Sequence, residues 1–340
     1  MRVDYYLPPI GLQAAADHAG RASNLGYDGF FTAETNHDPF LPLGVAAAVA
    51  PDLELGTGIA VAFGRSPMVV AHTAWDLAAA SRGKFILGLG SQVRAHLTRR
   101  YSTPWVAPVP RLREYVRALH AIWSAWQEGG PLRFEGEHYR FSLMLPFFDP
   151  GPIDHPAVPV FTAAVGPAMT RLAGEVCDGI HVHPFHTVRY FDEVTLPALQ
   201  EGASAAGREL SDVAVAASVF VAIGRTEEEI GSAREAVRKQ IAFYASTPTY
   251  RPILDLHGWE IGPKLSALAR RSDWDAMTGL IDDRILDEVA VTGSPEAIGR
   301  LLRERYGSRL QRVAFYGAGP GVTVGLDDDD WRAITEAIHS

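Results

Sequence analysis

Residues 53–88 read LELGTGIAVAFGRSPMVVAHTAWDLAAASRGKFILG, and this stretch decides the fold. The short apolar runs Leu53–Val61 and Phe85–Gly88 predict two buried strands, and the longer run between them, Pro67–Ala80, predicts a helix. Ser66 and the proline after it support the helix start, because proline lacks the amide hydrogen that a first-turn residue leaves unpaired anyway. A strand, a helix and a second strand in this order are typical of a parallel sheet covered by helices.

The same alternation continues along the whole chain. Further strands are predicted at Arg2–Leu7, Asp28–Thr32, Val158–Ala163, Gly179–His183, Val213–Ile223 and Arg312–Gly317. Further helices are predicted at Gly11–Leu25, Arg111–Trp126, Pro167–Glu175, Tyr190–Ala206, Glu227–Tyr244, Pro295–Tyr306 and Asp327–Ile338. Eight strands with helical crossovers favour an α/β fold of the closed (β/α)8 TIM-barrel type, although the pattern alone is also compatible with a doubly wound open sheet.

We expect one domain over residues 1–340, with insertions near residues 98–110, 132–151 and 247–287. The second insertion contains Phe134–Tyr139, which predicts a small hairpin, and the third has a helical pattern around Lys264–Arg270. Long insertions on a barrel commonly form lids over the face that carries the active site, the carboxyl ends of the strands. We therefore expect these segments at that face.

The composition excludes several classes of function. A formal net charge of −9 argues against a nucleic-acid-binding protein, because the phosphate backbone would be repelled. Neither a signal peptide nor a run of roughly 20 apolar residues is present, which predicts a cytoplasmic protein that does not bind membranes. The lone cysteine, Cys177, excludes an internal disulfide, and its apolar neighbours predict a buried packing role.

In a (β/α)8 barrel the active site lies where the strands end, so the residues after each strand are the candidates. Ala163–Pro167 follows the fifth strand with small residues and then opens a helix. Backbone amides can approach a ligand closely there, and the positive end of the helix points to the same place, which suits a phosphate. A strand-to-helix turn without a ligand is an equal alternative.

Glu34, His37 and Asp38 cluster after the second strand. Such a cluster can supply a general acid or base if burial tunes a pKa. The alternative is a capped loop, in which Asn36 or Asp38 starts a helix after Pro39. We favour a functional role for at least one of these residues.

His181, His183 and His186 raise the possibility of a metal site. A metal would need further ligands in suitable geometry, and no HExxH pair accompanies these histidines, so no metal is expected. A polar wall for an aromatic cofactor or substrate is the favoured interpretation, with satisfied structural histidines as the alternative. The segments 56–58 and 88–90 lack the third glycine of a dinucleotide fingerprint, and neither a phosphate loop nor a nucleophile elbow occurs.

Several segments, in their order and spacing, resemble the luciferase-like monooxygenase superfamily. Within that superfamily the chain most resembles the branch, common in actinobacteria, that uses the deazaflavin coenzyme F420. The segments are LGYDGFF (25–31), LGTGI (55–59), Leu77 with SRGKFILGLG (81–90), FEGEHY (134–139), RLAGEVCDG (171–179) and TGSPE (292–296).

The resemblance implies where a cofactor would bind. Its ring is expected against a bulge in the third strand, held by a non-proline cis peptide bond that corresponds here to Gly58–Ile59. Its phosphate contacts correspond to Ala164, Val165 and Gly166, in agreement with the anion site inferred above. Ser91 and Gln92, at the end of the fourth strand, complete the set of expected cofactor contacts.

Two positions depart from the family pattern. F420-dependent sugar-phosphate dehydrogenases carry an Asp-His pair where this chain has Glu34-Thr35, and a glutamate where it has Val93. Their acid–base assignment therefore does not transfer, and Gln92, Arg94 and His96 are expected to line the site instead.

These observations predict hydride transfer between coenzyme F420 and a small organic substrate. Glu34 is the first candidate for the proton role, followed by His37 and His183. An FMNH2-dependent monooxygenase supplied by a partner reductase, with FMN as the cofactor, and a non-catalytic flavin-binding protein are the alternatives. The resemblance also implies a homo-oligomer, expected as a dimer, which the apolar segments around Trp123, Trp126 and Phe147–Phe148 would permit.

Overall fold

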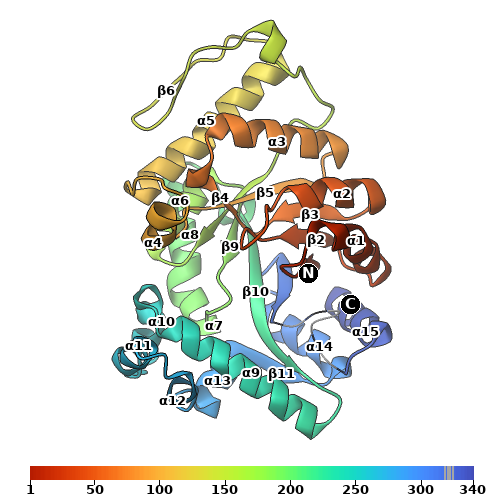
Figure 1. Cartoon of the computed structure of the whole chain (residues 1–340), viewed down its shortest axis with the longest axis vertical. Helices are drawn as coiled ribbons and strands as arrows, with labels where there is room; N and C mark the ends of the chain where they lie inside the picture. The colour runs from red at the N-terminus through yellow and green to blue at the C-terminus, as the bar shows by residue number, and fades with distance from the viewer. Residues whose placement is uncertain (318, 320–322, 324) are drawn as a thin grey trace.

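The computed structural model describes residues 1–317, 319, 323 and 325–340, and it contains a closed parallel barrel (Figure 1). Each barrel strand pairs in parallel with the next, and the last pairs with the first, which closes the sheet and confirms the predicted (β/α)8 barrel over an open sheet. In their order around the barrel the strands are β1 (Arg2–Tyr6), β2 (Gly29–Thr32), β3 (Glu54–Thr57), β5 (Phe85–Gly90), β8 (Val160–Ala164), β9 (Gly179–Val182), β10 (Ala214–Ile223) and β12 (Arg312–Tyr316).

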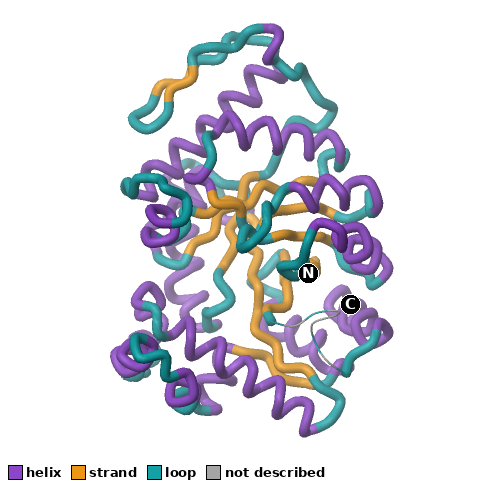
Figure 2. The backbone as a smooth tube through the Cα atoms, viewed as in Figure 1, coloured by secondary structure: helices purple, strands orange, loops and turns teal. Residues whose placement is uncertain are grey.

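All eight predicted strands overlap these elements, and helices surround them, as Figure 2 shows. The predicted helices are also present, and two of them, α3 and α14, have the predicted bounds. The surrounding helices are α1 (Ala15–Asn24), α2 (Leu41–Val49), α3 (Pro67–Ala80), α4 (Arg94–Arg99), α5 (Pro108–Glu128), α6 (Pro167–Val176), α7 (Val188–Tyr190), α8 (Leu196–Ala205), α9 (Glu227–Ala245), α14 (Pro295–Tyr306) and α15 (Asp328–His339).

The insertion at 132–151 projects from the barrel at one end of the molecule (Figure 1). It contains the predicted hairpin, in which β6 (Phe134–Glu135) pairs with the antiparallel β7 (Arg140–Phe141). Beyond the hairpin, the Phe147 side chain is 90% exposed and that of Phe148 is 60% exposed.

The insertion at 247–287 folds against α9 at the opposite end (Figure 1). It forms its own apolar cluster, in which Trp259, Leu265 and Leu286 are buried. A short strand follows that the sequence did not predict: β11 (Ala290–Gly293) pairs with the extended end of β10. The four helices of the insertion are α10 (Arg251–Leu256), α11 (Gly262–Ala269), α12 (Trp274–Thr278) and α13 (Asp283–Val289).

Side chains fill the middle of the barrel and leave no room there for a ligand among the described residues. Phe31, Ile86 and Phe161 pack against one another in the interior. A side chain at Gly56 would overlap the ring of Phe31, and one at Gly179 would overlap the ring of Phe161, so glycine is required at both positions. A ligand site must therefore lie beyond one end of the strands.

Two expectations about buried residues have clear outcomes. Cys177 is fully buried, and burial raises the pKa of its thiol, as the packing role predicted. In the segments expected to permit a dimer, Trp123 and Trp126 are buried within the protein, with 4% of Trp123 and none of Trp126 exposed. Both tryptophans pack against α3: the indole of Trp123 donates to the carbonyl of Ala71, and the ring of Trp126 lies against that of Trp75.

Candidate active site

A cavity of about 830 Å³ lies at the carboxyl ends of the strands, where a barrel carries its active site. Its wall contains residues from the ends of β3, β5, β8, β9 and β12, so segments far apart in sequence meet around one space. The seven residues predicted to contact a cofactor all line it: Gly58, Ile59, Ser91, Gln92, Ala164, Val165 and Gly166.

One wall of the cavity is a bulge in the third strand. β3 ends at Thr57, and the chain resumes pairing with β5 only at β4 (Ala60–Val61). The Gly58–Ile59 bond between these strands is cis, as the resemblance implied. A side chain at Gly58 would overlap the hydroxyl of Tyr6, so only glycine allows the bulge and the Tyr6 ring to share this space.

Another wall is the start of α6, where Ala164, Val165 and Gly166 precede Pro167. Gly166 caps the helix with extended backbone and no side-chain hydrogen bond. A Cβ atom at Gly166 would meet nothing within 4 Å, so open space adjoins this helix start. This arrangement can accept a phosphate or another anion.

His183, the third of the candidate catalytic residues, lies in the cavity wall. Its ring packs between Tyr244 and Tyr250, with 4.6 Å between ring centroids in each pair. Its Nδ1 accepts a hydrogen bond from the amide of Phe185 at 3.1 Å. Burial, with a smaller effect of His186, lowers the pKa of His183 to about 3, so its imidazole is neutral and donates through Nε2.

Glu34 and His37 are not in the wall of the cavity. The Glu34 carboxylate accepts hydrogen bonds from Val61, Arg65 and Tyr101, and His37 is exposed. The first choice of Glu34 as proton carrier therefore gains no support from the geometry. The side chain of the neighbouring Asp38 accepts the amides of residues 40 and 41 next to the start of α2, although the N-cap of that helix is Phe40.

The other two histidines differ in their relation to the cavity. His181 also lines it, and its buried ring packs against Phe31 and Phe161, where burial lowers its pKa to about 3. His186 packs outside the cavity wall, and burial lowers its pKa to about 4. Among the described residues no group of three metal-ligating side chains comes together.

The sequence analysis missed a pair of tyrosines in the wall, Tyr244 and Tyr316, whose hydroxyls are hydrogen bonded. Tyr316 ends β12, so the rule of reading residues at strand ends would have found it. Tyr244 comes from the end of α9 and carries no such signal. Of the residues suggested as replacements for the family's acid–base pair, Gln92 and Arg94 line the cavity and His96 does not.

The cavity wall has a simple charge pattern. Within the described part of the chain, no aspartate or glutamate lines it, and Arg94 is its one arginine or lysine. The hydrogen-bond donors that remain belong to neutral histidine, tyrosine, tryptophan, serine, threonine and amide groups. The site therefore favours an anionic ligand group near Arg94 and uncharged groups elsewhere.

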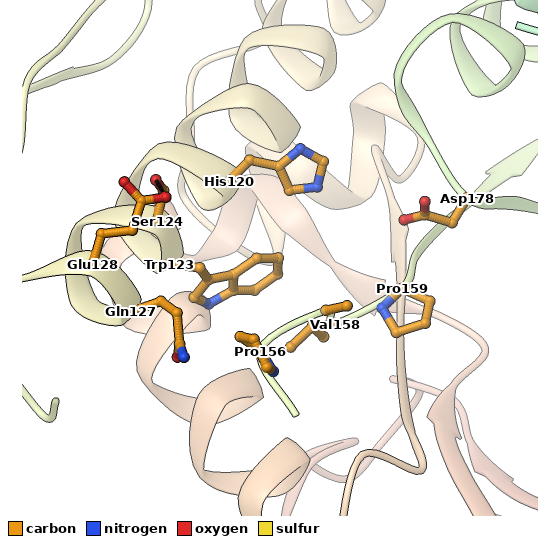
Figure 3. A pocket seen from close by; sticks show the side chains of 10 residues that line it. His120, Trp123, Ser124, Gln127, Glu128, Pro156, Val158, Pro159 and Asp178 are labelled. Atoms are coloured by element: carbon orange, nitrogen blue, oxygen red, sulfur yellow. Dashed lines mark hydrogen bonds between the residues drawn. The ribbon is translucent and has the colours of Figure 1, made fainter. Parts of the chain in front are cut away.

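A second cavity, of about 490 Å³, lies at the other end of the barrel, before β8 and β9 (Figure 3). Most of its polar side chains are already used for structure: Gln127 accepts the amide of Ile153, Ser124 donates to Glu128, and Asp178 accepts the amide of Val160. This recess is therefore not the candidate active site.

Fold and site together define a (β/α)8-barrel protein with a ligand cavity at the carboxyl ends of its strands. More specifically, the chain belongs to the luciferase-like monooxygenase family, whose sequence model matches residues 2–312. Family membership supports an oxidoreductase activity. No helix among the described residues has the length and apolar character needed to cross a membrane.

Two individual proteins are similar to this chain in sequence over most of its length. An uncharacterized protein of Mycobacterium tuberculosis is 49% identical over 306 residues, which cover 90% of each chain. The 5,10-methylenetetrahydromethanopterin reductase of Methanolobus tindarius is 27% identical over 297 residues, which cover 86% of each chain.

Solved structures share the fold at low sequence identity. The coenzyme F420-dependent tetrahydromethanopterin reductase of Methanopyrus kandleri superimposes with a TM-score of 0.79 at 21% identity, covering 100% of this chain and 98% of that one. A type II Baeyer-Villiger monooxygenase of Pseudomonas putida, solved with FMN, has a TM-score of 0.65 at 16% identity and covers 99% and 96% of the two chains.

Proposed function

We propose that this protein is a coenzyme F420-dependent oxidoreductase that acts on a small organic substrate. The observation that carries the proposal is that Gly58 and Gly166 line one cavity. A strand bulge and a helix start then face the same space, which suits a planar ring with a phosphate-bearing tail. The similarity to the reductase of Methanolobus tindarius and to the coenzyme F420-dependent reductase of Methanopyrus kandleri supports the deazaflavin over FMN.

The residues present fit such a cofactor. The Gly58–Ile59 bulge would bear on the ring, and the amides at Ala164–Gly166 would bind the phosphate. Arg94, exposed at the cavity, supplies positive charge for the anionic tail. When bound, the deazaflavin supplies two-electron chemistry by giving or taking a hydride.

The remaining wall would hold the substrate. His183, Tyr244 and Tyr316 form a neutral surface of hydrogen-bond donors and aromatic rings. Such a surface can orient an oxygen of the substrate and limit the access of water. With His183 neutral and Tyr244 protonated near neutral pH, we propose this group in place of Glu34 and His37 for the proton role.

The test is a titration of the purified protein with F420 and, separately, with FMN, followed by intrinsic and cofactor fluorescence. The proposal expects saturable binding of F420 with an affinity at least tenfold above that for FMN, a difference of about 1.4 kcal/mol. Preferred binding of reduced FMN and oxygen consumption with a reductase would favour the monooxygenase instead. Tight F420 binding without oxidation or reduction by any of a broad set of alcohols, carbonyl compounds and imines would favour the non-catalytic alternative.

We propose a homodimer in the cytoplasm as the working form, with no nucleic-acid or membrane partner. The exposed side chains of Phe147 and Phe148 on the projecting insertion support a self-contact there. Light scattering of the wild type and of a Phe147→Ser, Phe148→Ser variant tests the dimer. A wild-type protein that is monomeric at micromolar concentration would exclude it.

A further inference from the structure

The loop after β2 crosses the bulge of the third strand, and Glu34 makes the connection. Regular pairing of β2 with β3 ends at Thr32 and Thr57. Beyond that point the Gly58 amide donates to the carbonyl of Thr32 at 2.7 Å, and the Glu34 amide donates to the carbonyl of Ile59 at 3.0 Å. Backbone bonds thus hold the near side of the bulge to the loop.

The side chain of Glu34 holds the far side. The amide of Val61, the second residue after the bulge, donates to Oε2 of Glu34 at 2.7 Å. In a regular sheet a carbonyl of the neighbouring strand would accept this amide, whereas here the carboxylate of Glu34 accepts it. Through its own amide and its carboxylate, this one residue binds both Ile59 and Val61.

The carboxylate has further donors and no contact with the cavity. Arg65 Nη1 donates to Oε2 at 2.6 Å, and the Tyr101 hydroxyl donates to Oε1 at 2.8 Å. The Glu34 side chain is 7% exposed, and it is not part of the cavity wall. Both oxygens are already hydrogen bonded, which suits a structural anchor more than a group that exchanges protons with a ligand.

We infer that Glu34 is a positioning residue: its hydrogen bonds hold the Gly58–Ile59 bulge in the place where it would support the cofactor ring. This role rests on the proposed cofactor site, and it differs from direct proton transfer. If the carboxylate loses its charge, its hydrogen bonds to Val61 and Arg65 both weaken. The backbone of the bulge should then move more at Val61, on the side away from β2. The phosphate site at Gly166 lies on another wall and keeps its geometry.

The experiment compares Glu34→Gln with Asp38→Asn. Asp38 pairs with the same Arg65, at 3.0 Å, but among the described residues it makes no hydrogen bond to the bulge, and the side-chain oxygen of asparagine can still accept the amides of residues 40 and 41. Two quantities are measured: amide hydrogen exchange of residues 58–61 in the cofactor-free protein, and the dissociation constant for F420. Exchange within α3, the helix next along the chain, reports whether the variant folds normally.

We expect Glu34→Gln to speed exchange at Val61 and to weaken F420 binding, each by on the order of tenfold, the size expected for a charge-assisted hydrogen bond. Asp38→Asn should leave both quantities unchanged. If Glu34→Gln does not fold, Tyr101→Phe removes one donor from the carboxylate without changing any charge, and it should shift both quantities in the same direction by a smaller factor.

The two measurements separate this inference from the proposed function. A wild-type protein that does not bind F420 overturns the proposed function, and the exchange measurement still tests the anchor. Unchanged exchange at residues 58–61 in Glu34→Gln overturns the anchor. Faster exchange with unchanged F420 affinity overturns the link between anchor and cofactor, and lost turnover with both quantities unchanged returns Glu34 to the proton role.

Discussion

The hydroxyl groups of Tyr244 and Tyr316 are hydrogen bonded to each other in the cavity wall, although one residue ends a helix and the other ends a barrel strand. The ring of His183 packs edge-on against Tyr244. Burial, with a smaller effect of Tyr316, raises the pKa of Tyr244, so this phenol keeps its proton at physiological pH. The pair therefore presents a hydrogen-bond donor to whatever occupies this side of the cavity.

Tyr316→Phe should impair the substrate step and leave cofactor binding intact. The substitution removes one hydroxyl of the pair, and it should lower kcat/KM by about tenfold to a hundredfold, the value of one or two lost hydrogen bonds. Tyr250→Phe is the matched control, because Tyr250 also packs on His183 but does not line the cavity. Equal losses in the two variants, or a weakened F420 affinity in Tyr316→Phe, would contradict this assignment.

The two glycines of the cavity should respond differently to alanine. At Gly58 the new methyl group would overlap the Tyr6 hydroxyl, so the ring must move, at a cost of about 1–3 kcal/mol in the free energy of unfolding. At Gly166 the methyl group meets no atom within 4 Å, and the free energy of unfolding should change by less than about 0.5 kcal/mol. Urea denaturation of both variants measures this difference.

For Gly166→Ala the expected loss is in ligand binding. The methyl group would stand in the open space in front of the helix start, where the phosphate is proposed to bind. F420 affinity should therefore fall although stability does not. An alanine variant that binds F420 as well as the wild type would remove this helix start from the proposed site.

Three buried histidines should make the protein less stable in mild acid. Burial lowers the pKa of His181 and His183 to about 3 and that of His186 to about 4, whereas an unfolded chain titrates near about 6.5. Between these values only the unfolded chain takes up protons, so the free energy of unfolding falls as the pH falls below about 6.5. Each histidine can contribute up to about 1.4 kcal/mol per pH unit.

Urea denaturation at pH 7, 6 and 5 measures this dependence. A His183→Gln variant has one such group fewer, so its stability should depend less steeply on pH than that of the wild type. Identical slopes for the two proteins would show that His183 is not kept neutral by folding.

The strands could be predicted because each is a short apolar run bounded by turn residues. α2 entered the sequence analysis only as the alternative of a helix after Pro39, because its sequence, LPLGVAAAV, lacks a polar face and contains proline and glycine. β11 was missed because its four residues follow a long insertion and pair only with the end of β10 beyond the barrel. Both elements depend on tertiary packing that periodicity does not report.

The site was predictable only in part, for a related reason. Strand ends identify which backbone segments surround the cavity, and Gly58, Gln92 and Gly166 follow from that rule together with the resemblance. Strand ends do not indicate whether a given side chain points into the cavity or away from it. Glu34 follows a strand, yet it turns toward Arg65, 31 positions later, and away from the cavity. The Tyr244–Tyr316 pair joins residues 72 positions apart and leaves no local signal.

The amino end of the barrel should control stability without affecting the site. Arg312 binds both carboxylate oxygens of Asp4, through Nε at 2.8 Å and Nη2 at 2.5 Å, and at most 5% of either side chain is exposed. Asp4→Asn leaves the buried guanidinium without its main counter-charge and should cost about 3–5 kcal/mol in the free energy of unfolding. The exposed pair Arg300–Glu304 is the control, and Glu304→Gln should cost less than about 0.5 kcal/mol.

Because Asp4 lies in the middle of β1 and is not part of the cavity wall, the Asp4→Asn protein that remains folded at low temperature should bind F420 like the wild type. Thermal unfolding and F420 titration of the same samples measure the two effects separately. A cost below about 1 kcal/mol would mean that solvent or Glu54, which also pairs with Arg312, compensates for the lost charge. A weakened F420 affinity in the folded protein would mean that the two ends of the barrel are coupled through its interior. The Asp4–Arg312 pair would then affect the ligand site as well as stability.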